Sequence, residues 1–415
     1  MKLMTSFRKL LLLCATALIL GACSKDEAIP LPDVSESHVY SGSKLKLRYA
    51  SELMPAKEVT FIPADGVSAA KLECKGLTDL SLLSSLGLSG TGPAPGVIPG
   101  SPEISLPITL RDAGDYYAFQ GSSQSDYVSS FNYSGKLQAD SLVLNISDVK
   151  LRSEVLAGSV WVPVKLKREG AQILESPFHL VWELNPSSAI HVDLSQVLDL
   201  LSLVPIIPTY HDTAYSSIEQ LYSSALQTVA FLENGNIVVR YYSSVGGATQ
   251  LMTSVGNTLQ YVAAGGSNLL LFPNPTTLAG RWLVAQSDPG DNPDISFRSD
   301  SEDGLQQDLL LILKGMIPGV LKMCTDGIPL TYQLSDNNLS IYVSTPVILG
   351  LLSQVVEAIE ANPQILQGLL QKLGQVVPDQ EVLAAIEELL PQLKQLLLDT
   401  TTVEIGLNFT RYTPA

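Results

Sequence analysis

The chain has 415 residues, of which 46% are hydrophobic and 16% charged, and its formal net charge is −16. Its length exceeds what one small hydrophobic core needs and predicts two domains. The high apolar content excludes a largely disordered chain, and the acidic balance makes nucleic acid a poor partner.

The first 22 residues have the order of a signal peptide. Lys2, Arg8 and Lys9 form a basic start, and residues 10–20 are an uncharged apolar segment. Eleven apolar residues are too few to cross the roughly 30 Å of a hydrocarbon core. An ordinary secretory signal, with the nearby cysteine incidental, is the alternative. Removal of residues 1–22 would leave 22 basic and 41 acidic residues, a net charge of −19.

The segment Leu20-Gly21-Ala22-Cys23 resembles the lipobox of bacterial lipoproteins. The resemblance implies cleavage before Cys23, a diacylglycerol on its sulfur and an acyl chain on its new amino group. Residues 24–27 include Asp26 and Glu27, and are similar to the export signal of Bacteroidetes lipoproteins. We therefore expect the membrane to be a partner through this anchor. The expected location is the outer face of the outer membrane, with a periplasm-facing display as the alternative.

The remaining chain predicts an α+β protein with two parts behind the anchor. Residues 23–37 read as an acidic tether, residues 38–186 as an antiparallel β domain, and residues 187–415 as a domain that mixes an antiparallel sheet with amphipathic helices. No later segment reaches about 18 uninterrupted apolar residues, so we expect no second membrane span.

The first domain is predicted to be an antiparallel β-meander, barrel-like or a sandwich, because short alternating segments recur between turn residues. The Gly- and Pro-rich segment 87–107 predicts a loop or an irregular sheet edge. Residues 79–88 could form a short helix. The expected strands cover 39–49, 58–62, 69–75, 104–110, 116–120, 128–137, 141–151, 159–167 and 172–184.

The second domain alternates helices and hairpins. Apolar spacing predicts helices over 193–204, 214–226 and 305–323. Hairpins are predicted to turn at residues 233–236, where Asn-Gly indicates a type I′ turn, at Gly265-Gly266, and at residues 335–338. Residues 402–412 predict a closing strand that carries its apolar side chains on one side: Val403, Ile405, Leu407 and Phe409.

Three C-terminal segments, each with a proline in its first turn, carry paired apolar residues once per helical turn. Pro391 should kink the third segment. Such helices either cover a sheet and each other, or wall an apolar pocket for a lipid or hydrophobic metabolite. The second interpretation names these pocket walls: Leu351, Leu352, Val355, Leu369, Leu370, Leu373, Ile386 and Leu390.

Chemistry-bearing motifs are missing from the sequence. It contains no Gly-x-Ser-x-Gly, Walker, His-Glu-x-x-His or Cys-x-x-Cys pattern, so we expect no enzyme, no catalytic residues, no cofactor and no metal site. The acidic residues 288–294 could bind Ca²⁺, but a solvated loop is favoured. His179 is predicted to be a satisfied strand residue. Cys74 and Cys324 are expected to be buried thiols, although a disulfide is permitted.

The Tyr-Ser-Gly phrases at Tyr40 and Tyr133 are similar to those of uncharacterised gut Bacteroidetes lipoproteins. Some of these carry calycin-like or other β-rich, lipid-binding-like domains. The resemblance implies a non-catalytic surface lipoprotein that binds a hydrophobic or lipid-like ligand. The alternative is a glycan-binding protein, adhesin or accessory subunit that uses exposed tyrosines: Tyr116, Tyr117, Tyr127, Tyr133, Tyr241 and Tyr242.

Overall fold

The computed structural model shows an α+β protein with antiparallel sheets and a few C-terminal helices, so the predicted class is confirmed. The predicted signal peptide, Cys23 and the predicted helix 193–204 lie outside the described residues. The structure describes residues 31–64, 68–79, 90–169, 172–190, 222, 225–245, 248–254, 257–274, 319–362, 364, 384 and 387–413.

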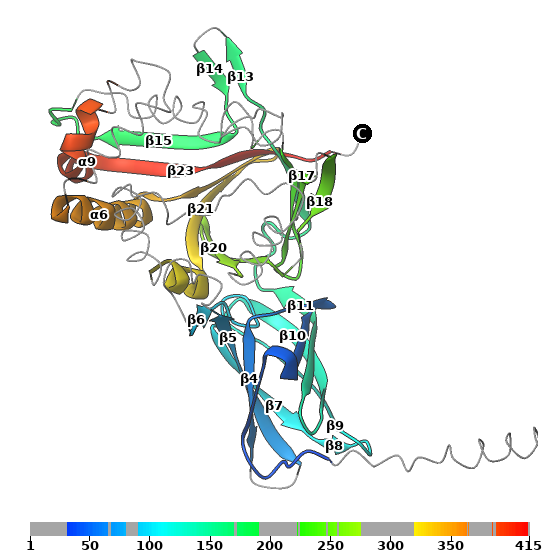
Figure 1. The fold of residues 1–415 in the computed structure, drawn as a ribbon. Helices are drawn as coiled ribbons and strands as arrows, with labels where there is room; N and C mark the ends of the chain where they lie inside the picture. The colour runs from blue at the N-terminus through cyan, green and yellow to red at the C-terminus, as the bar shows by residue number, and fades with distance from the viewer. Residues whose placement is uncertain are drawn as a thin grey trace, which may run out of the picture.

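Two sheets make up the N-terminal part, at the bottom of Figure 1. The first sheet has the order β1-β4-β5-β6, with β7 also paired to β5, and the second has the order β3-β2-β11-β10-β9-β8. The first comprises β1 His38–Ser41, β4 Lys57–Pro63, β5 Ala69–Asp79, β6 Thr91–Ala94 and β7 Glu103–Thr109. The second comprises β2 Leu45–Tyr49, β3 Glu52–Leu53, β8 Arg111–Asp112, β9 Tyr117–Ser123, β10 Val128–Leu137 and β11 Leu142–Leu151.

The two sheets pack as a sandwich. Alternate residues of each strand point inward, as period-two geometry requires. Phe61 and Leu72 from the first sheet and Phe131 and Leu144 from the second are fully or almost fully buried in one cluster. The pairing of β2 with β11 is parallel, whereas the other pairs are antiparallel. The sandwich form, one of the predicted possibilities, is therefore the one adopted.

Two local predictions for this part need comment. The expected strand 39–49 is broken by the 3₁₀ turn η1 Gly42–Lys44, because Gly42 takes a φ of +55° that ends β1. The segment 87–107 contains β6, which pairs only with β5 and is therefore a sheet edge, as the sequence allowed.

A ten-stranded curved sheet dominates the C-terminal part. Its order is β18-β17-β16-β12-β23-β22-β21-β20-β19, with β15 also paired to β23. A separate hairpin joins β13 Lys167–Glu169 to β14 Gln172–Glu175. The ten strands are β12 Ser159–Pro163, β15 Phe178–Leu184, β16 Leu226–Phe231, β17 Ile237–Val245, β18 Ala248–Thr253, β19 Leu259–Gly265, β20 Asn268–Pro273, β21 Ile328–Leu334, β22 Asn338–Val343 and β23 Thr400–Arg411.

The predicted meander of the first domain is wrong for β12 and β15. They were expected to complete the first domain, but both hydrogen-bond to β23, which is more than 200 residues later in the chain. Apolar alternation identifies which face of a strand is buried, but it does not determine which strand pairs with it. The final strand, β23, therefore pairs with two strands that precede residue 186.

The curved sheet is almost a closed ring. Strand β12 pairs with β16, β16 with β17, and the strands from β19 to β23 pair successively until β23 returns to β12. At the seam between β17 and β19, Asn236 and Gln260 form an isolated bridge. The Tyr261 amide donates to the Gly235 carbonyl at 2.8 Å, and Gln260 Nε2 donates to Asn236 Oδ1 at 3.0 Å. These bonds close one end of the ring.

The hairpin of β16 and β17 forms as predicted, but the predicted type I′ turn is wrong. The Leu232 amide donates to the Asn236 carbonyl at 2.9 Å, and the Gly235 amide donates to the Leu232 carbonyl at 3.0 Å. In this loop only Gly235 has a positive φ, +84°. The loop is thus the three-residue kind, a type I turn followed by a left-handed glycine. The Asn234 carbonyl accepts a hydrogen bond from the Tyr49 hydroxyl at 2.5 Å, which holds the loop against the sandwich.

The helices lie beside β23 at one end of the ring (Figure 1). They comprise α6 Thr345–Ala361, η3 Leu390–Gln392 and α9 Leu393–Asp399, and residues 319–326 are also helical. Pro346 occupies the first turn of α6, as predicted, and Pro391 falls in the 3₁₀ turn η3 that precedes α9. Pro363 and Pro378 lie outside the described residues. In the part of the chain that is described, no helix has the length and apolar character needed to cross a membrane.

One hydrophobic core runs through both parts. The same cluster contains Phe61 of the sandwich and Phe409 of the ring. Asn257 Nδ2 donates to the Leu53 carbonyl, and Asn274 Nδ2 donates to the Pro55 carbonyl at 3.3 Å. The sandwich therefore closes the same end of the ring that the Asn236–Gln260 bridge closes.

Candidate functional site: the apolar cavity of the ring

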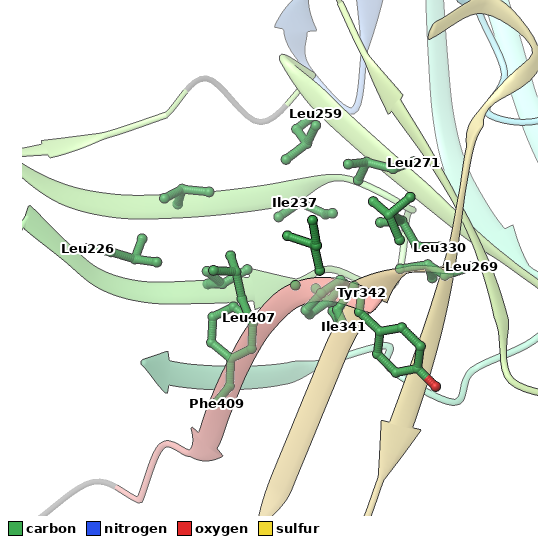
Figure 2. A pocket seen from close by; sticks show the side chains of 16 residues that line it. Leu226, Ile237, Leu259, Leu269, Leu271, Leu330, Ile341, Tyr342, Leu407 and Phe409 are labelled. Atoms are coloured by element: carbon green, nitrogen blue, oxygen red, sulfur yellow. The ribbon is translucent and has the colours of Figure 1, made fainter. Parts of the chain in front are cut away.

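A cavity of about 350 Å³ lies on the inner face of the ring (Figure 2). Seven strands, β16, β17, β19, β20, β21, β22 and β23, contribute to its wall. The described lining residues are Leu226, Val229, Phe231, Ile237, Val239, Leu259, Leu269, Leu271, Leu330, Ile341, Tyr342, Val343, Ile405, Gly406, Leu407 and Phe409.

Strand alternation explains this lining. Ile405, Leu407 and Phe409 are two residues apart on β23, and so point to the same side of the sheet. The prediction that they share one side is confirmed. Ile341 on the neighbouring strand is opposite Leu407 and adds to the same wall. Because the sheet curves around this side, the apolar side chains face one another across a space.

The cavity has a buried end and an accessible rim. Phe231, Ile237 and Leu269 are 2%, 3% and 1% exposed. Ile405, by contrast, is 41% exposed. A ligand would therefore enter near Ile405 and extend toward the end that the sandwich closes.

The lining that the structure describes offers a ligand almost no polar group. Tyr342 is its one residue with a polar side chain, and its ring and hydroxyl point away from Leu330, Ile341 and Leu407 in Figure 2. Gln333 Nε2 donates to the Tyr342 hydroxyl at 3.0 Å. The cavity can thus recognise apolar surface and shape, and each methylene that it takes from water contributes about 0.8 kcal/mol.

A polar cluster lies on the opposite face of the same sheet, on β15, β22 and β23. His179 Nε2 lies 2.7 Å from Glu404 Oε2, and the His179 ring stacks on Tyr342 with 4.3 Å between centroids. Gly406 is opposite both rings in the strand register, and its missing side chain leaves room for the stack. His179 is therefore a satisfied strand residue, as predicted.

The described residues among the predicted pocket walls are not part of this lining. Leu351, Leu352 and Val355 are half-buried on α6, which packs against β23 and α9. That packing fits the other interpretation, in which the helices cover a sheet and each other. Leu390 lies in η3. The other four residues lie outside the described residues: Leu369, Leu370, Leu373 and Ile386.

The strand residues that do line the cavity were missed as a site, although their signal was present. Alternating apolar residues were recognised in the hairpins and in the final strand. Nothing in the alternation shows that these strands share one interior, because that depends on β12 closing the ring with β23.

Four of the six candidate glycan-binding tyrosines lie on strands and the other two, Tyr116 and Tyr127, lie in bends beside them. Tyr133 is buried, with its hydroxyl donating to the Pro107 carbonyl, and Lys136 Nζ lies 4.3 Å from the centre of the Tyr116 ring. Tyr241 and Tyr242 lie on β17. Of the six, only Tyr242 is exposed, with 39% of its surface accessible to solvent.

The two described cysteines are free and buried, as predicted, with Cys74 1% and Cys324 7% exposed. Burial raises the pKa of the Cys74 thiol to about 12, so it is a poor nucleophile. Within the described ranges, no three His, Cys, Asp or Glu side chains gather as metal ligands. Residues 288–294 lie outside those ranges.

No protein-family model, curated protein or solved structure matches this chain. A proposed function therefore rests on the cavity.

Proposed function

We propose that the protein is a non-catalytic lipoprotein, anchored in the outer membrane through Cys23 and displayed at the cell surface, that binds a hydrophobic or lipid-like ligand. The observation that carries the binding role is the apolar cavity of the ring. Its volume of about 350 Å³ falls within the ~300–1,000 Å³ usual for small-molecule sites.

The anchor is supported by the N-terminal residues. The basic start, the short apolar segment and the Leu20-Gly21-Ala22-Cys23 phrase match what lipidation requires. Two or more acyl chains hold a protein at a membrane far more firmly than one. The acidic residues after Cys23 favour surface display.

The ligand class is supported by the chemistry of the wall. An apolar wall without a free hydrogen-bonding group gains affinity from hydrocarbon and loses it to any buried polar group that stays unpaired. The glycan-binding alternative has weaker support, since one of its six tyrosines is buried and only Tyr242 is exposed.

The experiment uses the lipid-free chain from Ser24 and a fluorescent fatty acid. We expect saturable binding that falls by more than about tenfold in Leu407→Trp, because the indole fills the cavity. Leu334→Trp is the matched control, since Leu334 is 42% exposed and does not line the cavity. Circular dichroism would verify that both variants fold. No uptake by the unaltered chain, or equal losses in the folded variants, would contradict the proposal.

A further inference from the structure

Lys57 is a lysine buried inside the sandwich. It is 4% exposed and shares the inward face of β4 with Val59 and Phe61. Its Nζ donates to the Pro95 carbonyl at 2.5 Å. No carboxylate of a described residue pairs with it, whereas Lys75 on the next strand pairs with Glu58 at 2.8 Å.

The local backbone explains why the amine is held there. Lys57 is opposite Gly76 in the register of β4 and β5. A Cβ on Gly76 would lie 2.3 Å from the Pro95 carbonyl oxygen, so only glycine lets that carbonyl approach the strand. The carbonyl satisfies one of the three donors of an ammonium group and supplies no negative charge.

Burial therefore lowers the pKa of Lys57, and no described carboxylate is paired with the amine to oppose this. The pKa of the Lys57 amine falls from 10.5 to about 7, and no charged group of a described residue contributes to this shift. At neutral pH a large share of the side chain is then an uncharged amine, the nucleophilic form of lysine.

A second cavity, of about 330 Å³, has Lys57 in its wall. Its wall includes Leu45, Leu47, Leu53 and Met54, and Lys57 is the one ionisable residue in its described lining. Ala56, also in the wall, has a φ of +63°, in the left-handed region that costs a non-glycine residue about 1 kcal/mol. A largely apolar pocket whose wall includes a lysine without an ion pair among the described residues suits a molecule with a hydrocarbon body and a reactive polar end.

We propose that Lys57 captures an aliphatic aldehyde in this cavity as a reversible imine. The amine nitrogen forms a bond to the carbonyl carbon, the carbon–oxygen bonds break, and the oxygen leaves as water with the two amine protons. Nothing is oxidised or reduced, and water reverses the step. The apolar wall holds the alkyl chain. The site is separate from the cavity of the ring.

The test treats the mature protein in detergent with hexanal and cyanoborohydride at pH 7, followed by peptide mass spectrometry. The reductant converts each imine into a stable alkylamine. We expect Lys57 to be alkylated at least about tenfold faster than Lys71 and Lys75, which lie at the surface in ion pairs.

Two variants keep the result interpretable. Lys57→Arg retains a donor for the Pro95 carbonyl and cannot form an imine, so adducts on the peptide containing residue 57 should disappear. Met54→Trp fills the cavity and should slow alkylation of Lys57 while leaving Lys71 unchanged. An unmodified Lys57 beside alkylated surface lysines would overturn the proposal and leave Lys57 as a structural donor. Equal labelling of Lys57 in folded Met54→Trp would also overturn it.

Discussion

The sandwich and the ring are built from the same kind of strand, yet the same alternation produces different interiors. In the sandwich, two sheets face each other, and inward side chains such as Leu72 and Leu144 interdigitate and are completely buried. In the ring, one sheet curves until its own strands face each other, and Leu271 and Leu407 remain only half-buried beside an open space. Curvature therefore leaves room for a ligand where face-to-face packing leaves a filled core.

The two regions also differ in the charge that their interiors hold. The described lining of the ring cavity is almost entirely hydrocarbon, whereas that of the sandwich cavity includes Lys57. The two cavities therefore differ in the charge that their walls can carry.

The largest expected effect is a difference in stability loss between a leucine in the filled core and a leucine beside the cavity. Leu72→Ala, in the sandwich, should lower the free energy of unfolding by about 3–5 kcal/mol, because it leaves a void in a filled core. Leu271→Ala, in the ring, should cost only about 1–2 kcal/mol, since its side chain already borders empty space. Urea unfolding of both variants measures the difference. Equal losses would mean that the ring is packed as tightly as the sandwich.

The next effect concerns Lys57 and pH. Its pKa is about 7 in the folded chain and 10.5 when unfolded, so between these values the unfolded chain binds a proton that the folded chain does not. Stability should therefore rise with pH by up to about 1.4 kcal/mol per unit between pH 7 and 10. Below pH 7 both states are charged, and the full cost of burial is present.

Lys57→Met should remove this rise and be more stable than the unaltered chain at pH 6. The measurement is urea unfolding from pH 6 to 9.5. Lys75→Met is the control, because Lys75 is exposed and ion-paired and its removal should leave the rise in place. A rise that persists unchanged in Lys57→Met would assign it to another group.

The smallest effect tests how the ring meets the sandwich. Gly235 has a φ of +84°, and a Cβ there would lie 3.2 Å from Leu151 and 3.3 Å from Pro99 of the sandwich. Gly265 has a φ of +92° and no atom within 4 Å of such a Cβ. Gly265→Ala should cost about 1 kcal/mol of backbone strain, and Gly235→Ala about 1 kcal/mol more. Thermal unfolding compares them, and a smaller loss for Gly235→Ala would argue against a tight junction.

Much of the local structure follows from the sequence, because local patterns encode it. Apolar alternation located the closing strand and the hairpins that turn at Gly235 and Gly265, and it placed Ile405 and Leu407 on one side. Pro391 marked the break before α9. The burial of Lys57 was also within reach, since Val59 and Phe61 have the same parity on their strand.

Strand partners that are distant in the sequence were decided only by the tertiary structure. The pairing of β12 and β15 with β23 joins residues more than 200 positions apart, and it creates both the ring and its cavity. The loop at Gly235 is held against the sandwich by the Tyr49 hydroxyl, which is 185 positions away from Asn234 in the chain. A sequence pattern says which side of a strand avoids water. Which strands then enclose a space depends on curvature and on long-range pairing, and neither has a local signature.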